Sequence, residues 1–259
     1  MRGFRTLGRI AVTAALGAAL AACGGVTSGE VSEADAARIA ALQDRLDALE
    51  AQVVEAEDVA AIKRLMRTYG FYLDRGLWED LSDLFTEDAR GNYPAGVFIG
   101  RESLSPHFLE NNGRGYVGFE EGRLGNHIVL QPVIDVAEDG VTAEGRWRVV
   151  AQLGQYGQSA NWAGGIYEID YRKDDGVWKI SSLDYYSVFG APYATGWGSA
   201  PPAEAGAATT ERRQAIFRNL PRPPDEPRVE HQGVPPFHYD NPVTGRPFVA
   251  EDWYEEEGE

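Results

Sequence analysis

The sequence predicts an α+β fold in which helices precede a curved antiparallel sheet. Residues 39–69 contain no Gly or Pro and have apolar side chains at helical spacing. Further along, four long runs have strand-like patterns, at residues 126–137, 140–154, 160–173 and 176–189. The short segments between these runs, such as "EDG" and "KDDG", have the composition of β-hairpin turns. The expected arrangement is therefore a meander of strands with the helices packed on one face.

The N-terminus has the features of an export signal. Residues 1–22 contain three arginines, an apolar run and small residues that lead to Cys23, the one cysteine of the chain. The apolar run is too short for a membrane span of about 20 residues. The sequence "LAAC" resembles the lipobox of bacterial lipoproteins, in which the cysteine is lipidated and becomes the first mature residue. The alternative is a plain signal peptide in which Cys23 has no special role.

The lipobox resemblance implies an exported protein, anchored by lipid at Cys23 to the periplasmic side of the bacterial cell envelope. Gly24 follows the cysteine where an acidic residue would be the retention signal, which favours the outer membrane.

The charge of the chain excludes some partners. The net charge is −16, and removal of residues 1–22 makes it more negative by three units. Such a surface repels phosphate backbones, and no basic cluster is present, so we expect no nucleic-acid partner. There is no HExxH motif, His/Cys cluster or dense acidic loop, so no metal is expected. A glycine-rich phosphate loop and a GxSxG motif are also missing, and we expect no cofactor.

A tether and a stalk are expected before the globular domain. Residues 23–36 are small and polar. Residues 37–57 contain a heptad-like seam of apolar side chains, namely Ile39, Leu42, Leu46, Leu49 and Val53. The seam lasts about two heptads, so an isolated coiled coil would be marginal. Either this segment is a stalk that forms a dimer or trimer, or it is an amphipathic helix that lies on its own domain.

The apolar positions then shift to Ile62, Met66, Tyr69 and Leu73, which predicts that the helix enters a globular domain at residues 58–189. The helix should end at Gly76, with Asp74 in its last turn. A helix C-terminus disfavours negative charge, so Asp74 either forms the turn or lines a pocket.

Shorter elements are expected after this helix. They are a short helix from Trp78, a strand at residues 89–93 and a helical segment at residues 101–112 that Pro106 interrupts.

Residues 190–259 form a Pro-rich C-terminal extension. Their aromatic residues, which include Phe237, Tyr239, Phe248 and Trp253, argue against pure disorder. We expect an arm that packs on the domain or on a neighbouring subunit, with a solvated tail as the alternative.

The domain resembles the SnoaL-like, nuclear-transport-factor-2-like superfamily. The resemblance rests on Tyr69-x4-Asp74, "RGLWEDLSDLFTEDA", "NHIVLQPVIDVAEDGVTAEGRW" and "DDGVWKISSLDYY", and covers about half of the chain. It implies a cone: a strongly bent sheet that wraps a long N-terminal helix and leaves a deep, mostly apolar pocket. Because members include enzymes and non-enzymes, the fold alone defines no function.

The chain is most similar to the branch of scytalone dehydratase and bile acid dehydratase. That resemblance implies catalytic roles for Tyr69, Asp74, Tyr93 and His127. In scytalone dehydratase a second histidine follows on the next strand, and the matching position here is near Gly145. Arg146 and Arg148 lie alongside, and at this position the resemblance does not supply a second catalytic partner.

The implied chemistry is cofactor-free dehydration or isomerisation beside a carbonyl group. Asp74 would fix and charge the imidazole of His127, which would move a proton. Tyr69 and Tyr93 would donate hydrogen bonds to the carbonyl or enolate oxygen. Each residue has a structural alternative: a helix-ending turn for Asp74, a solvent-facing position for His127, core packing for Tyr69 and a strand end for Tyr93.

Further candidates for ligand binding are Trp78 beside Asp74, Arg146 beside Gly145, and Asn161, which could instead be ordinary core or surface residues. Two functions stay open. The first is a lipid-anchored protein that binds a small lipophilic or aromatic molecule and turns it over. The second is a non-catalytic ligand-binding or assembly module of the cell envelope.

Overall fold

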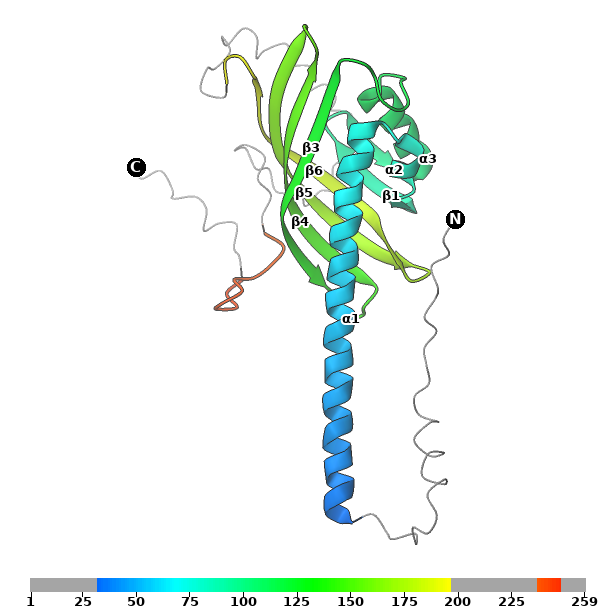
Figure 1. Cartoon of the computed structure of the whole chain (residues 1–259), viewed down its shortest axis with the longest axis vertical. Helices are drawn as coiled ribbons and strands as arrows, with labels where there is room; N and C mark the ends of the chain where they lie inside the picture. The colour runs from blue at the N-terminus through cyan, green and yellow to red at the C-terminus, as the bar shows by residue number, and fades with distance from the viewer. Residues whose placement is uncertain (1–31, 197–236, 248–259) are drawn as a thin grey trace, which may run out of the picture. The chain divides into compact units, whose positions relative to one another are not determined.

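The computed structural model describes residues 32–196 and 237–247. Cys23, the signal segment and most of the C-terminal extension lie outside the described residues. The helices are α1 (Glu33–Arg75), α2 (Trp78–Ser82), α3 (Arg101–His107) and the π-helix η3 (Phe108–Asn112). The strands are β1 (Phe85–Tyr93), β2 (Gly96–Ile99), β3 (Arg123–Val136), β4 (Thr142–Gln155), β5 (Ser159–Asp174) and β6 (Val177–Pro192). Figure 1 shows the helices and the long strands of the sheet.

Helix α1 belongs to two compact units, one that ends at Ala51 and one that begins at Gln52. In the first unit, residues 33–51 are helical and exposed throughout, including the seam residues Ile39, Leu42, Leu46 and Leu49. Among the described helices, none is long and apolar enough to cross a membrane.

The second unit contains the sheet and the core. Here α1 buries the apolar stripe that its sequence predicts: Ile62 and Met66 are fully buried, and Tyr69 and Leu73 are nearly so. These side chains pack with Phe85, Phe108, Trp147, Ile180 and Leu183 in one hydrophobic cluster. Burial of this stripe is the main force that fixes the helix on the sheet, at about 25 cal/mol per Å² of apolar surface.

The six strands form one sheet in the order β2-β1-β6-β5-β4-β3. The four long strands are an antiparallel meander, as expected. The sheet as a whole is mixed, however, because β1 pairs with β6 in parallel, and the short strand β2 was not foreseen. Hairpins force antiparallel pairing on β3 to β6, but β1 reaches β6 without a hairpin and is free to run parallel to it.

Strand β3 is one of the two edge strands, and it contains a bulge. Its register against β4 shifts between Leu130 and Val133, and Gln131 adopts a φ of 49°. Pro132 therefore sits at an edge and a bulge, the two places where a sheet tolerates proline. The bulge exchanges the two faces of the strand, so Val129 and Ile134 both point to the core although their numbers differ in parity.

We define the inner face of the sheet as the face against which α1 packs. A β-carbon at Gly70 of α1 would lie 3.4 Å from the side chain of Val129, so Val129 marks this face on β3. Trp147, Val149 and Ala151 mark it on β4, where alternate residues are buried. The opposite side is the outer face.

Candidate functional site

Asp74 and His127 form a hydrogen-bonded pair. The Oδ1 atom of Asp74 lies 2.7 Å from the Nδ1 atom of His127, and both carboxylate oxygens accept from the backbone N–H of His127, at 2.9 and 3.1 Å. Both side chains are largely buried. The carboxylate at the helix end, which the macrodipole disfavours, is thus compensated by N–H donors from β3.

Gly70 lets the end of the helix approach β3 closely. A β-carbon at Gly70 would lie 3.1 Å from the carbonyl oxygen of His127, so α1 approaches the strand backbone at that point. Asp74 lies one helical turn later on the same face of the helix. Gly76 ends the helix with a φ of +66°, the left-handed conformation typical of a C-terminal cap. The local sequence Gly70 to Gly76 therefore positions the carboxylate.

His127 points to the inner face of the sheet. It pairs across the strands with Ala151, and residues directly opposite in a sheet share a face. If Nδ1–H donates to Asp74, the Nε2 atom is left as an acceptor. Within the described part of the chain, no residue forms a hydrogen bond to Nε2.

Asp74 and His127 line a cavity of about 310 Å³. Leu73, Leu124 and Leu153 form apolar parts of its wall. Most of the lining is polar, with side chains from Asn111, Asn112, Arg114, Arg123, Gln155, Ser159 and Asn161. This cavity is more polar than the resemblance implies, and it has the composition of a site that orients a ligand by hydrogen bonds.

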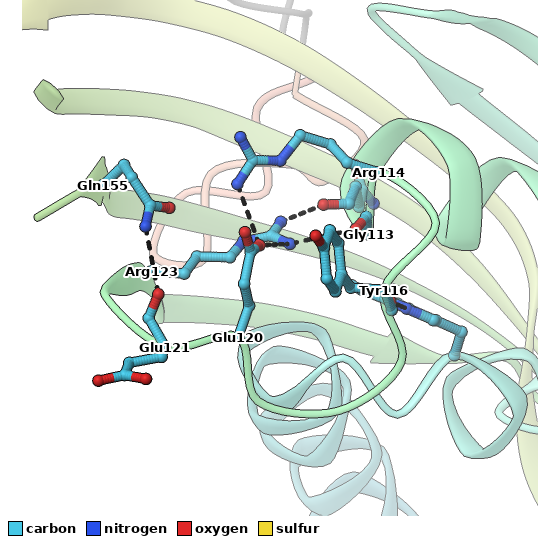
Figure 2. A network of polar contacts seen from close by, with 9 residues as sticks. Gly113, Arg114, Tyr116, Glu120, Glu121, Arg123 and Gln155 are labelled. Carbon is cyan, nitrogen blue, oxygen red and sulfur yellow. Dashed lines mark hydrogen bonds and ion pairs between the residues drawn. The ribbon is translucent and has the colours of Figure 1, made fainter. Parts of the chain in front are cut away.

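A loop at residues 113–122 is held beside the cavity by a polar network (Figure 2). Glu120 accepts from Arg114 at 3.1 Å and lies 3.5 Å from Arg123. Arg123 also donates to the backbone oxygen of Asn112. Trp78 donates to the backbone oxygen of Tyr116 at 2.6 Å. These contacts connect the loop to the start of β3 and to α2.

Tyr69 and Tyr93 lie together in the core. Their hydroxyl oxygens are 3.3 Å apart, and neither residue is part of the cavity lining described above. Burial raises the pKa of both phenols far above the usual range, and for Tyr69 the nearby Tyr93 adds to it. Tyr167 packs edge-on against Tyr69 at 5.9 Å, and the charge of Asp74 contributes to the raised pKa of Tyr167 after burial and the neighbouring tyrosines. The tyrosine cluster is therefore neutral and close to the pair.

Of the three further ligand-binding candidates, the structure places two at the cavity and one elsewhere. Trp78 and Asn161 both line the cavity. Arg146 lies on the outer face, because it alternates with the inward-facing Trp147. There it is ion-paired with Glu168, and its guanidinium lies 4.5 Å from the ring centroid of Phe237 in the C-terminal extension. The structure thus does not bring Arg146 to Asp74 and His127, because Arg146 is an even-numbered residue of β4 and the odd-numbered residues face inward.

Gly145 is not the position that faces His127. It pairs with Ile134, and Ala151 is the residue opposite His127. Six residues of strand, about 20 Å, separate the two positions. A β-carbon at Gly145 would lie 2.8 Å from the ring of Tyr171, so that place is filled by the Trp147–Tyr171 hydrogen-bonded pair. The position near Gly145, where the resemblance would place a second histidine, therefore lies away from the cavity.

Several cavity residues were not found from the sequence, above all Asn111, Arg123, Gln155 and Ser159. The consecutive pair Asn111-Asn112 before a glycine was the available signal, since asparagine is uncommon in a helix interior. Arg123, Gln155 and Ser159 sit next to one another only because β3, β4 and β5 pair in this register.

A long helix against the inner face of a bent sheet, with an Asp–His pair beside a cavity, defines a cone-shaped domain of the α+β class. A model of the SnoaL-like domain family matches residues 54–184, which is half of the chain. The chain belongs to this family.

Solved structures also resemble it. A protein from Novosphingobium aromaticivorans, whose name proposes a scytalone dehydratase, is 24% identical, with a TM-score of 0.47 over 58% of this chain and 99% of that one. A type 2 hexachlorocyclohexane dehydrochlorinase is 22% identical, with a TM-score of 0.47 over 58% and 98%. A type 3 enzyme of the same name, from Novosphingobium barchaimii, is 19% identical, with a TM-score of 0.48 over 58% and 99%.

The described residues contain no group of three or more His, Cys, Asp or Glu side chains arranged to hold a metal ion.

Proposed function

We propose that the domain binds a small lipophilic or aromatic molecule that carries a carbonyl group, and catalyses its cofactor-free dehydration or isomerisation. The observation that carries this proposal is the 2.7 Å contact between Asp74 and His127 at the wall of a cavity. A carboxylate that fixes an imidazole at the wall of a cavity is an arrangement that suits general acid–base catalysis.

In the proposed reaction, the Nδ1–H group of His127 stays hydrogen-bonded to Asp74. The Nε2 atom accepts a proton from the carbon next to the carbonyl group. The electrons of that C–H bond form a C=C bond, and the carbonyl π electrons move to oxygen to give an enolate. The enolate then collapses and expels a hydroxyl group from the neighbouring carbon, which takes the proton from the imidazolium and leaves as water. For isomerisation, the same proton returns to a different carbon. Asp74 stabilises the imidazolium between the two steps.

The remaining cavity residues have supporting roles in this proposal. Trp78 and Asn161 contact the ligand as parts of the wall. Tyr69 and Tyr93 lie outside the cavity lining, so they donate to the enolate oxygen only if a ligand reaches their buried hydroxyls. Arg146 has no place in the proposed site, since it belongs to the outer face.

The test is deuterium uptake at the α-carbon of a panel of hydroxy-ketones, followed by NMR together with any loss of water. We expect uptake with the unaltered protein, and a loss of about a hundredfold or more in Asp74→Asn and His127→Ala. His238→Ala is the matched control, because it removes an ion-paired histidine of the outer face. Equal uptake with all four proteins would contradict the proposal. The absence of uptake for every hydroxy-ketone of the panel would also contradict it.

A second candidate function is that of an assembly module. The seam residues Ile39, Leu42, Leu46, Leu49 and Val53 are all exposed, and an exposed apolar seam favours self-association. We propose a homo-oligomer, dimer or trimer, formed by this segment. Leu42→Ser with Leu46→Ser should lower the mass measured by light scattering, whereas Asp44→Ser should not. A mass unaffected by the double change would argue against the seam.

We also propose that the protein is exported and anchored to the envelope by lipid at Cys23. Support comes from the "LAAC" sequence at the end of an apolar run. The mass of the mature N-terminus tests this, because lipidation adds acyl mass to Cys23, and an unmodified Cys23 would refute the anchor.

A further inference from the structure

Asn111 is held at the cavity wall by an unusual turn. Helix α3 runs directly into the π-helix Phe108–Asn112, whose i+5 hydrogen bond is made by the N–H of Gly113 to the oxygen of Phe108 at 2.8 Å. Such turns insert one extra residue and are frequent at functional sites. Gly113 is required here, since a β-carbon would lie within 2.7 Å of three atoms, among them Nε1 of Trp78. The turn brings Asn111 to the cavity that Asp74 and His127 line.

His107 fixes the amide of Asn111. The Nδ1 atom of His107 lies 3.0 Å from Nδ2 of Asn111. An amide side chain keeps its shape when its nitrogen and oxygen are exchanged, so Oδ1 can take the same place. The imidazole stacks with Phe98 and Tyr93, with ring centroids 4.0 and 4.8 Å away and interplanar angles of 26° and 30°. It is only 4% exposed. Burial lowers the pKa of His107 to about 4, so the ring is neutral at ordinary pH. A neutral imidazole has one donor and one acceptor nitrogen.

The orientation of the amide follows from the other ring nitrogen. Nε2 of His107 is buried and has no partner among the described residues. If Nε2 carried the proton, the core would contain an unpaired N–H donor, which is rarer in proteins than an unpaired acceptor. The proton therefore belongs on Nδ1, and the Asn111 amide must be turned so that Oδ1, in place of Nδ2, accepts from it. The amide nitrogen of Asn111, with its two N–H donors, then faces the cavity.

We propose that Asn111 is a catalytic residue that donates hydrogen bonds to the carbonyl oxygen of the substrate, and to the enolate that forms from it. His107 is a positioning residue that keeps the amide in this orientation. This inference rests on the proposed function. It assigns the oxyanion donor to Asn111 and not to Tyr69 and Tyr93, which do not line the cavity.

The substrate class becomes narrower as a result. The cavity must hold one oxygen at Asn111 while the neighbouring carbon faces Nε2 of His127. A compact carbonyl compound with a hydroxyl group one carbon further on meets this requirement. A neutral hydrocarbon gains nothing from Asn111.

The experiment uses 4-nitrophenolate as an enolate mimic, titrated against the full-length protein and followed by its absorbance. The unaltered protein should bind the phenolate. Asn111→Leu, which keeps the shape but removes the donors, should weaken binding by about tenfold or more, because a hydrogen bond to a charged group is stronger than one between neutral groups. Asn126→Leu is the matched control, as Asn126 bonds to Gln152 outside the cavity lining. It should bind as the unaltered protein does.

His107→Phe keeps the ring stack and removes the hydrogen bond to Asn111. It should weaken phenolate binding less than Asn111→Leu. In ¹⁵N NMR, the side-chain amide of Asn111 should shift on phenolate binding in the unaltered protein, and this shift should be reduced in His107→Phe. A merely structural role of His107 would leave the amide shift unchanged.

Three results would overturn the inference. The first is that the unaltered protein does not bind the phenolate, and the second is that Asn111→Leu and Asn126→Leu bind it with equal affinity. The third is that Tyr69→Phe or Tyr93→Phe loses binding while Asn111→Leu retains it. Phenolate binding involves no proton transfer, so it reports on the hydrogen-bond donor at Asn111 and not on the base. Failure of the proposed function appears instead as α-carbon exchange that does not depend on Asp74 and His127, and the two failures are thereby distinguished.

Discussion

The carboxylate of Asp74 holds His127 by two kinds of bond, one to the imidazole Nδ1 at 2.7 Å and the others to the backbone N–H of the same residue at 2.9 and 3.1 Å. A turn-forming role for the acid would need only its own backbone, so this geometry favours a role in fixing the ring. Because the backbone bonds anchor the carboxylate independently, the ring bond can be changed while the helix end stays in place.

A first prediction concerns the tautomer of His127. In the unaltered protein, we expect the neutral imidazole to be mainly the Nδ1–H form, since the carboxylate accepts from it. Asp74→Asn should give a mixture of tautomers, because an amide can donate or accept. The ¹⁵N shifts of the imidazole measure this. Unchanged shifts in Asp74→Asn would show that Asp74 does not set the tautomer.

A second prediction concerns stability. Asp58 of α1 is buried, accepts from Nε1 of Trp178 at 2.8 Å, and pairs with Lys173 at 2.8 Å. Asp58→Ala should lower the free energy of unfolding by about 3 kcal/mol, because it leaves a largely buried ammonium and an indole N–H without their acceptor.

The control for Asp58 is Asp88, whose ion pair with Arg172 is exposed. Asp88→Ala should cost less than about 1 kcal/mol, in line with surface pairs. Denaturant titrations of the two variants provide the comparison. Equal losses would contradict the importance of burial at Asp58.

A third prediction concerns the stability of the fold at acidic pH. The pKa of His107 falls from 6.5 to about 4 in the folded protein because of burial. The unfolded chain therefore takes up this proton at higher pH than the folded protein does. The contribution of neutral His107 to stability is complete above pH 6.5 and is lost as the pH falls towards 4.

The size of this effect is up to about 3 kcal/mol, at 1.36 kcal/mol per pKa unit. In His107→Phe, the free energy of unfolding should fall less over this interval, as measured by urea titrations at several pH values. Parallel pH profiles in the two proteins would contradict a neutral, buried His107.

A fourth prediction concerns the described part of the C-terminal extension, residues 237–247. His238 contacts Glu168 at 3.0 Å and Asp135 at 3.3 Å on the outer face. Burial acts to lower the pKa of His238, but the hydrogen bond to Glu168 and the charges of Glu168, Glu144 and Asp135 outweigh it, so the pKa is raised. The charged form therefore favours the bound arm, and this contribution is lost as the pH rises through the raised pKa.

Hydrogen exchange of residues 237–247, corrected for intrinsic rates, should thus be slowest in mild acid and increase with pH. His238→Ala should exchange quickly at all pH values, and Glu168→Gln should reduce the pH dependence. Exchange that is uniformly fast in the unaltered protein would show that the arm does not bind through His238.

The sequence determined the parts of this protein that depend on local pattern. The helical spacing of Ile62, Met66, Tyr69 and Leu73 gave the buried stripe of α1, Gly76 gave its end, and the hairpin turns gave the four long strands. These features follow from periodicity and turn chemistry within short segments, and need no knowledge of distant contacts. The suggestion that Asp74 and His127 work together came from resemblance and stays a prediction, while the structure shows that the two side chains are in contact.

Only the tertiary structure decided which side chains meet. The parallel pairing of β1 with β6 depends on a chain path that no local signal encodes. The bulge at Gln131 reversed the faces of β3, Arg146 fell on the outer face with Glu168, and the residue opposite His127 proved to be Ala151. Asn111 reached the cavity through a π-turn whose single extra residue changes every later orientation. A shift of one residue in strand register, or one extra residue in a helical turn, changes the direction in which a side chain points. The directions of these side chains are therefore fixed by packing across the whole domain.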